Sequence, residues 1–338
     1  MDERLMVIVG YDTAELLDIA CVTTPLAMAN AHVTALTDAT ANALGSPSRP
    51  YRVTVACPGG ASFTCGSGLT LQGQQSLEQL IGPLDTLIVS GGAGAGHERA
   101  ASDPRLLGHV RRLARESRRV VSVCTGAGIL AAAGLLDGRR ATTHWRFAAQ
   151  LAARHPKVVV DPDPIYIRDG NVYTAAGITS ALDLTLALIG EDHGAEVARS
   201  VARDLVTYLQ RPGNQAQMSL HTAAPPPRND LVRRLVEYIT GHPDHDLNAT
   251  ALAARAGVTP RHLARLFQEE LGQTPGRFVR QSRTEAAAHL LASTTLPMAS
   301  VATRCGLGTA ETLRQAFTSR YGISPSRYRA TQAAEGTA

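Results

Sequence analysis

The chain has 338 residues, an apolar fraction of 44% and a net charge of +4, which exclude a disordered protein and allow two or three domains with sizeable cores. The N-terminal MDERLMVIVG lacks the apolar run of a signal peptide, and the apolar stretch 175–190 is too short to cross a membrane. We therefore expect a cytoplasmic protein with no membrane partner. The five cysteines are scattered without CxxC spacing, so we expect neither a metal site nor a disulfide framework, and no cofactor.

The positive charge is concentrated in the last third of the chain. From residue 228 onward there are 14 arginines and no lysine against 9 acidic residues, whereas residues 1–227 carry a net charge of −1. A basic segment of this kind favours an anionic partner, nucleic acid first, although charged side chains on solvated helix faces would give the same count.

The first two hundred residues alternate strand and helix patterns. Short runs rich in Val and Ile predict strands at 5–10, 51–57, 85–92 and 118–124, and longer Ala/Leu-rich segments predict helices at 14–32 and 104–117. Apolar strands separated by helices indicate a parallel sheet covered on both faces. Three further strands are predicted at 158–160, 165–168 and 171–177, the last two joined by a turn at Asp169 and Gly170.

A polar, proline-rich stretch then separates this part from the rest. We place an interdomain linker at 210–229, between a first domain at 1–209 and a second at 230–331. The pattern after the linker predicts short helices and no strand.

The last hundred residues contain a repeat. The segment 252–275 resembles 301–325, and Leu263, Phe267, Gly272 and Pro275 recur fifty positions later. Each copy predicts a short helix, a glycine turn and a second helix, which is the helix-turn-helix arrangement. Thr259 and Thr309 suit the N-caps of the two second helices, and Pro260 suits a first helical position.

The outer faces of these second helices carry side chains suited to bases and phosphates. We expect contacts with double-stranded DNA from Arg261, His262 and Arg265 in the first copy, and from Glu311, Thr312, Arg314 and Gln315 in the second. The alternative is that the arginines form salt bridges on helix faces. Segment 275–293 predicts a spacer helix of about 27 Å, which would let both helices enter successive major grooves about 34 Å apart.

This repeat, with the ending GISPSRYR (322–329), resembles the AraC/XylS family of transcription regulators over residues 230–330. The resemblance implies two helix-turn-helix units and a role in transcription. Leu307 departs from the aromatic residue usual after the glycine, but it is also apolar.

A cysteine ends the fourth predicted strand in VVSVCTGAGIL (120–130). A strand, a turn of small residues and a helix predict a nucleophile elbow with Cys124 at the carboxyl end of a parallel sheet. The helix N-terminus beneath it would lower the pKa of the thiol, and the N–H groups of Thr125 and Gly92 would face an oxyanion. The run AGAGHE (93–98) lacks a nucleotide fingerprint, and we interpret it as a loop on the rim of this pocket.

The segments LIVSGG (87–92), SVCTGAG (122–128), AGLLDGRRATTHW (133–145) and 171–189 resemble the PfpI-type, class I glutamine amidotransferase-like superfamily over residues 4–200. This implies a flavodoxin-like, doubly wound α/β domain. The order of this domain followed by an AraC-type module looks like that of the GlxA family of regulators. The resemblance gives Cys124 an acidic partner in Asp18, with Glu15 as the rival, and a histidine in His144.

We therefore expect a DNA-binding transcriptional regulator that is not an enzyme, with a first domain that forms a homodimer and senses a small molecule. The alternatives are a cysteine-dependent enzyme, isonitrile hydratase-like or amidase-like, at Cys124, and a redox sensor at the same thiol. Cys124, Asp18 and His144 could also be structural residues, since a buried cysteine often acts as a small hydrophobic side chain.

Overall fold

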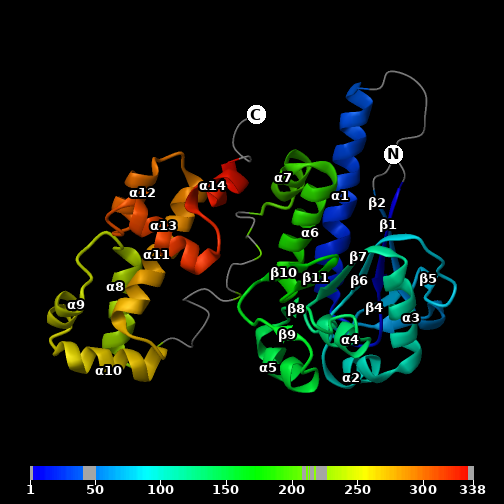
Figure 1. Ribbon diagram of the computed structural model, residues 1–338, viewed down its shortest axis with the longest axis horizontal. Helices are drawn as coiled ribbons and strands as arrows, with labels where there is room; N and C mark the ends of the chain where they lie inside the picture. The colour runs from blue at the N-terminus through cyan, green and yellow to red at the C-terminus, as the bar shows by residue number, and fades with distance from the viewer. Residues whose placement is uncertain are drawn as a thin grey trace. The chain divides into compact units, whose positions relative to one another are not determined.

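The computed structural model describes residues 3–40, 51–207, 211, 213, 217 and 227–333. The chain folds as two compact units, residues 1–217 and 218–338, which we describe separately. Figure 1 labels their helices and strands.

A seven-stranded sheet forms the centre of the first unit. Its order is β10 (Tyr166–Asp169), β11 (Val172–Ala175), β7 (Ser117–Val123), β6 (Leu84–Val89), β1 (Arg4–Val9), β2 (Tyr51–Cys57) and β5 (Gln75–Ser76). All neighbouring pairs are parallel except β10 with β11, which form the predicted hairpin with Gly170 at φ 63° in its turn. The chain winds outward in both directions from β1, as a doubly wound α/β fold requires.

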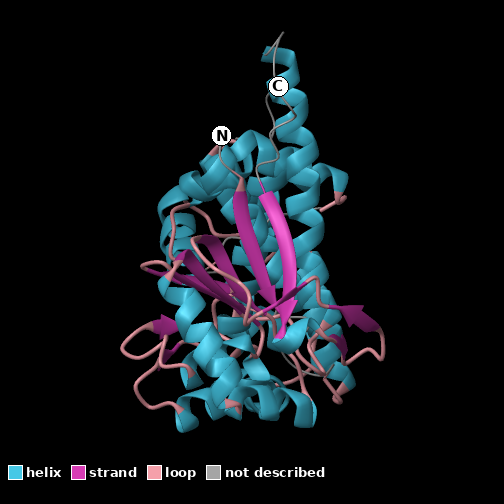
Figure 2. Ribbon diagram, turned by 90° about the vertical axis from the view of Figure 1, so that its right-hand side faces the viewer, coloured by secondary structure: helices cyan, strands magenta, loops and turns pink. Residues whose placement is uncertain are grey.

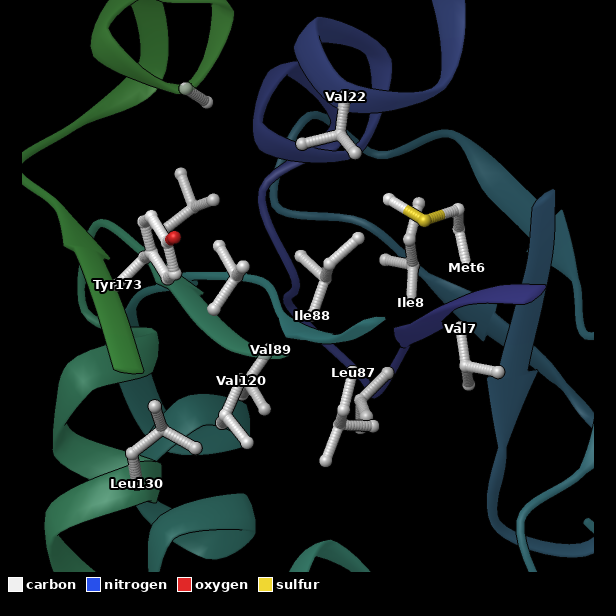
Figure 3. Close-up of a cluster of buried hydrophobic side chains, with 14 of the residues drawn as sticks. Met6, Val7, Ile8, Val22, Leu87, Ile88, Val89, Val120, Leu130 and Tyr173 are labelled. Carbon is white, nitrogen blue, oxygen red and sulfur yellow. The ribbon is translucent and has the colours of Figure 1, made fainter. Parts of the chain in front are cut away.

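Helices cover both faces of this sheet, because the strands are apolar on both sides (Figure 2). One face packs against α1 (Leu16–Thr40) and α6 (Ile178–His193), and α7 (Ala195–Asp204) packs against these two helices. The other face packs against α3 (Pro104–Arg115) and α4 (Gly126–Ala132). Figure 3 shows the alternation: Met6 and Ile8 point to the side of Val22 in α1, whereas Val120 points to the side of Leu130 in α4.

Within the described residues, one helix is long and apolar enough to cross a membrane, Leu16–Thr34 at the start of α1. In this fold it is a core helix, since Ile19, Val22 and Leu26 are buried and the helix packs against α6 and α7.

Two predictions for the first unit are wrong in detail. The strand expected at 158–160 is only the two-residue β9 (Val159–Val160), which pairs with β8 (Arg140–Ala141) outside the main sheet. The run AGAGHE, expected as a loop, begins helix α2 (Gly94–Ser102), because Gly94 takes φ 68° and turns the chain into helix. The remaining elements are η1 (Pro58–Gly60), the β3 (Ser62–Thr64) and β4 (Thr70–Gln72) hairpin, and α5 (Trp145–Arg154).

Every described element of the second unit is a helix, as predicted. The helices are α8 (Asp230–Gly241), α9 (Ala249–Arg255), α10 (Pro260–Leu271), α11 (Pro275–Ser293), α12 (Met298–Arg304), α13 (Ala310–Tyr321) and α14 (Pro325–Ala333). The predicted spacer helix at 275–293 is confirmed as α11.

Two separate cores hold this unit together, one for each copy of the repeat. Leu263 and Phe267 of α10 pack with α8 and α9, and Leu313 and Phe317 of α13 pack with α12 and α14. The helix α11 belongs to both cores: Phe278 and Val279 lie in the first, and Ala287, Ala288 and Leu291 lie in the second. Figure 1 shows α11 running between the two groups of helices, so it fixes one helix-turn-helix relative to the other.

The described residues at the start of the predicted linker lie on the first unit. Arg211 forms an ion pair with the buried Asp183 (Nη2–Oδ2 2.6 Å), and Gly213 accepts a hydrogen bond from the backbone of Tyr166. Gln217 contacts the loop before α5. The rest of the predicted linker, up to residue 226, lies outside the described residues.

Candidate functional sites

Both second helices of the repeat begin with the caps that the sequence predicts. The hydroxyl of Thr259 accepts the backbone N–H of His262, and that of Thr309 accepts the N–H of Thr312. The helices end at Gly272 and Gly322, which take φ 65° and 67°. Matching start and stop signals therefore give α10 and α13 the same length of twelve residues.

The outer face of α10 carries the predicted basic residues. Leu263, Leu266 and Phe267 are buried, which turns Arg261 and Arg265 toward solvent. The side chain of Arg265 is 65% exposed, and its nearest acid, Glu269, is 3.7 Å away. One Arg265 N–H also donates to Nδ1 of the half-buried His262 at 3.1 Å. The face thus offers two exposed guanidinium groups, and Arg261 forms no ion pair with any acid among the described residues.

The outer face of α13 is chemically different. Glu311, Thr312, Arg314 and Gln315 are all exposed, but Glu311 binds two of the others. Its carboxylate accepts two hydrogen bonds from Arg314 (2.8 and 2.7 Å) and one from the Gln315 amide (2.9 Å). These hydrogen bonds lower the pKa of Glu311 to about 2. The second helix therefore has a charge-neutral centre, whereas α10 has a positive one.

In the first unit, Cys124 lies at the sharp turn between β7 and α4. Its φ of 54° is unusual for a residue with a side chain and is the backbone strain expected of a nucleophile elbow. The hydroxyl of Thr143 donates to the Cys124 carbonyl at 2.8 Å and holds the turn. The elbow predicted from the sequence is present, although α4 spans only Gly126–Ala132.

Asp18 lies beside this cysteine, as the resemblance implies. Gly91 donates its N–H to Asp18 Oδ2 at 2.9 Å, and a Cβ on Gly91 would stand 2.6 Å from Cys124 Cβ, so only glycine fits between them. Asp18 is 1% exposed, and its Oδ1 has no hydrogen-bond partner among the described residues. Burial raises the pKa of Asp18 from 3.8 to about 7, and the Gly91 N–H lowers it in part.

The predicted activation of the thiol is wrong. Burial and the nearby Asp18 carboxyl raise the pKa of Cys124 to about 12, and the hydrogen bond from Thr125 offsets this only in part. Desolvation of the thiolate in this buried pocket is the largest cause of the raised pKa. The N–H of Gly92 does not face an open oxyanion site either, because it donates to the Thr125 hydroxyl at 2.8 Å, which in turn donates to the Gly92 carbonyl at 2.6 Å.

The two other predicted partners make contacts of their own. His144 is the N-cap of α5: its Nδ1 accepts the N–H of Arg146, and its ring lies against Trp145 and Phe147. Burial and the neighbouring Arg146 lower its pKa. Glu15 is half-buried and accepts the N–H of Leu17 at the start of α1. Both residues therefore cap helices near the cysteine.

A cavity of about 280 Å³ lies next to the elbow, between α2, α4 and α5. Of the predicted pocket residues, Gly92 and Thr125 line it, whereas Cys124, Asp18, Glu15 and His144 lie outside its wall. Its size is near the lower end for small-molecule sites, roughly 300 Å³. Phe147 and Leu151 give the cavity large apolar side chains, and the wall also contains alanines, glycines and polar residues. The full lining is Gly92, Ala93, Gly94, His97, Glu98, Ala101, Ser102, Thr125, Gly128, Ala132, Thr143, Phe147, Gln150, Leu151, Arg154 and His155.

Sequence reasoning did not single out three residues of this region, namely Tyr11, His97 and Thr143. The hydroxyl of Tyr11 lies 3.0 Å from both the Ser90 carbonyl and His97 Nδ1, and it is buried. His97 lies in the run 93–98, which the sequence predicts as a loop and the structure shows as the start of α2. Its place on the cavity-facing side of α2 depends on that run being helical.

Comparison with known proteins agrees with this architecture. Residues 20–191 match the DJ-1/PfpI family, and residues 252–331 match a helix-turn-helix domain family. The chain is 32% identical to the HTH-type transcriptional regulator CdhR of Pseudomonas aeruginosa over 83% of this chain and 82% of that protein. It is 30% identical to the HTH-type transcriptional regulator GlxA of Rhizobium meliloti over 82% of this chain and 85% of that protein.

The fold of the first unit has a counterpart among solved structures. A ThiJ/PfpI family protein from Pseudomonas syringae aligns with a TM-score of 0.54 and 22% identity, covering 71% of this chain and 87% of that one. The isonitrile hydratase of Pseudomonas putida is 39% identical over a shorter stretch, 42% of this chain and 60% of that enzyme. The chain belongs to the DJ-1/PfpI family and is a transcriptional regulator of the helix-turn-helix type, with a PfpI-like domain before an AraC-type DNA-binding region.

Proposed function

We propose that the second unit reads a specific DNA site with the outer faces of α10 and α13, and that the first unit pairs two copies and senses a small molecule. The exposure of Arg261 and Arg265, opposite the buried Leu263 and Phe267, carries the DNA-contact proposal. The residues proposed to contact DNA are the seven that the sequence analysis suggests: Arg261, His262, Arg265, Glu311, Thr312, Arg314 and Gln315. This role places the protein in the cytoplasm, where the DNA is.

The two helices contribute different chemistry. Arg261 and Arg265 suit guanine edges and phosphates, because a guanidinium can donate two hydrogen bonds at once. On α13, Thr312 and Gln315 are neutral groups at the outer face, and Arg314 is held by Glu311. We therefore assign most of the electrostatic affinity to α10 and most of the discrimination between sites to α13.

The test is genome-wide mapping of bound sites, followed by mobility shifts on the strongest site. We expect binding that resists excess competitor DNA and weakens steeply with salt, because phosphate contacts release counterions. If competitor DNA of any sequence abolished the binding, sequence-specific recognition would be contradicted.

The first unit has a surface suited to pairing with a second copy. Leu17, Thr24, Ala27 and Ala31 are exposed on α1, and their spacing of seven, three and four places them on one helical face. Leu17 alone is 47% exposed. Small residues on such a stripe let two helices approach closely.

Sedimentation equilibrium of the full chain should give a dimer, and Leu17→Glu should shift the equilibrium toward monomer. A monomeric parent protein would contradict the proposal.

The cavity between α2, α4 and α5 is the proposed effector site. Its wall includes α5, whose N-terminus is held by Gln217, the last residue of the first unit. The backbone N–H of Trp145 donates to the Gln217 side-chain oxygen (2.9 Å), and the Gln217 side-chain amide donates to the carbonyls of Thr143 (2.9 Å) and Pro162 (2.7 Å). A ligand that moves α5 would act on the point where the chain leaves this unit.

We propose that the protein is not an enzyme. A thiol with a pKa near 12 holds almost no thiolate at neutral pH, and the thiolate is the nucleophile. The Gly92 N–H is already occupied by Thr125. The cysteine-dependent alternative keeps some support from the strained elbow and from the likeness to isonitrile hydratase. Formation of an N-substituted formamide from an isonitrile by the purified protein, lost in Cys124→Ser, would establish that alternative.

A further inference from the structure

The hydrogen bonds around Tyr11 determine which nitrogen of His97 carries a proton. A phenol has a single proton, and a carbonyl oxygen can only accept. Tyr11 therefore donates to the Ser90 carbonyl at 3.0 Å, and its oxygen accepts from His97 Nδ1, also at 3.0 Å. Nδ1 must then carry a proton, and in a neutral ring it is the only protonated nitrogen. Burial lowers the pKa of His97 and so favours the neutral ring over the charged one.

The other nitrogen, Nε2, is left as a bare acceptor on the cavity side. His97 lines the cavity, and Nε2 has no hydrogen-bond partner among the described residues. It faces Gly128 in α4: a Cβ added to Gly128 would lie 3.8 Å from His97 Nε2. An acceptor fixed in this way favours a ligand that brings an N–H or O–H donor, and it disfavours one that brings only acceptors.

The charged residues of the wall neutralise each other. Glu98 and Arg154 form an ion pair (Oε2–Nη1 2.9 Å) with both side chains about half exposed. The cavity therefore presents no unpaired charge from this pair to a bound molecule. Bringing a charged ligand against Phe147 and Leu151 without a counter-charge would carry an uncompensated desolvation cost.

We propose that this cavity binds a small uncharged molecule with an N–H or O–H donor directed at His97 Nε2 and an apolar part against Phe147 and Leu151. The cysteine elbow is not part of the site, so binding is reversible and non-covalent. This rests on the effector role proposed for the cavity, and it adds the chemical class of the ligand.

The tautomer is tested directly by ¹⁵N NMR of the full chain labelled at histidine. We expect the His97 signals of a neutral ring protonated on Nδ1, which is the minor tautomer of free histidine. In Tyr11→Phe the acceptor for Nδ1 is lost, and the ring should shift toward the Nε2-protonated form. An Nε2-protonated or charged ring in the unmodified protein at pH 7.5 would overturn the proposal.

The ligand class is tested with three probes of similar size: benzamide, N,N-dimethylbenzamide and benzoate. In saturation-transfer NMR and calorimetry on the full chain, benzamide should bind about tenfold more tightly than the other two, the effect of one hydrogen bond. His97→Phe should remove that preference, and His155→Phe, in the same wall, should keep it. Equal binding of all three, no binding of benzamide, or a preference that survives His97→Phe would overturn the proposal.

These readouts do not depend on DNA. If benzamide binds as expected but ligands of this class leave DNA affinity unchanged, the effector role fails and the ligand class stands. If DNA affinity responds to small molecules while His97→Phe has no effect on their binding, this inference fails and the sensing role stands.

Discussion

The carboxylate of Glu311 holds the guanidinium of Arg314 through two hydrogen bonds of 2.8 and 2.7 Å, one turn along the same face of α13. The pair lies on the surface proposed to contact DNA. It leaves α13 without the free positive charge that Arg261 and Arg265 give to α10. DNA phosphates repel a carboxylate on such a surface. The Glu311 carboxylate therefore weakens binding to every DNA sequence whose bases offer it no hydrogen-bond donor.

Replacing Glu311 with glutamine should therefore relax specificity. Glu311→Gln keeps the size of the side chain, removes one negative charge and frees Arg314. We expect tighter binding to non-specific DNA and a salt slope steeper by about one, from one added phosphate contact. Glu237→Gln, an exposed change on α8, is the control for net charge. A ratio of specific to non-specific affinity that stays the same in Glu311→Gln would contradict this role.

The buried carboxyl of Asp18 should make the first unit less stable as pH rises. Its pKa is raised in the folded state from 3.8 to about 7, so the native state keeps a proton that the unfolded chain releases. The free energy of unfolding should then fall between about pH 4 and pH 7, by up to about 4 kcal/mol. Asp18→Asn should abolish this loss and be more stable than the parent at pH 8 but not at pH 4.

Urea unfolding of the first transition at several pH values measures this effect. Asp12→Asn is the control, because Asp12 is exposed and an asparagine can still accept the N–H of Thr64. A parent protein that gains stability between pH 4 and pH 7 relative to Asp18→Asn would show that Asp18 is ionised in the folded state.

Cys124 should react slowly at neutral pH. With a pKa of about 12, its alkylation by iodoacetamide at pH 7.5 should be much slower than that of the unfolded chain, and the rate should still rise at pH 10. Asp18→Asn should raise the rate, because the Asp18 carboxyl is one cause of the high pKa. Intact-mass analysis with peptide mapping measures the labelling. Rapid labelling or peroxide oxidation of Cys124 at neutral pH would instead support the enzyme or redox-sensor alternatives.

Removal of the Gln217 side chain should loosen the N-terminus of α5. Gln217→Ala loses the hydrogen bonds to Trp145, Thr143 and Pro162, which should destabilise this region by about 1–2 kcal/mol. Hydrogen exchange of residues 142–151 should become faster. Gln150→Ala, an exposed change on α5, should leave it unaltered. Unchanged exchange in Gln217→Ala would mean that the linker residue does not restrain α5.

The elements that the sequence predicted well depend on local signals. Most of the apolar strands and the caps Thr259 and Thr309 need only a few neighbouring residues, and the structure contains them. The thiol pKa was mispredicted because it depends on burial, which acts through the whole fold. Contacts such as Tyr11 with His97, 86 residues apart, or Gln217 with Trp145, 72 apart, follow from tertiary packing that no local pattern encodes.

The most direct test of the account is a hydroxyl-radical footprint on the strongest genomic site, with the parent and with Arg261→Ala/Arg265→Ala. Each bound subunit of the parent should protect two regions about 10 base pairs apart, one under α10 and one under α13. The double variant should lose one of these regions and bind at least about a hundredfold more weakly, from the loss of two charge-assisted contacts. Unchanged affinity with both regions still protected would contradict the assignment of α10 to the DNA.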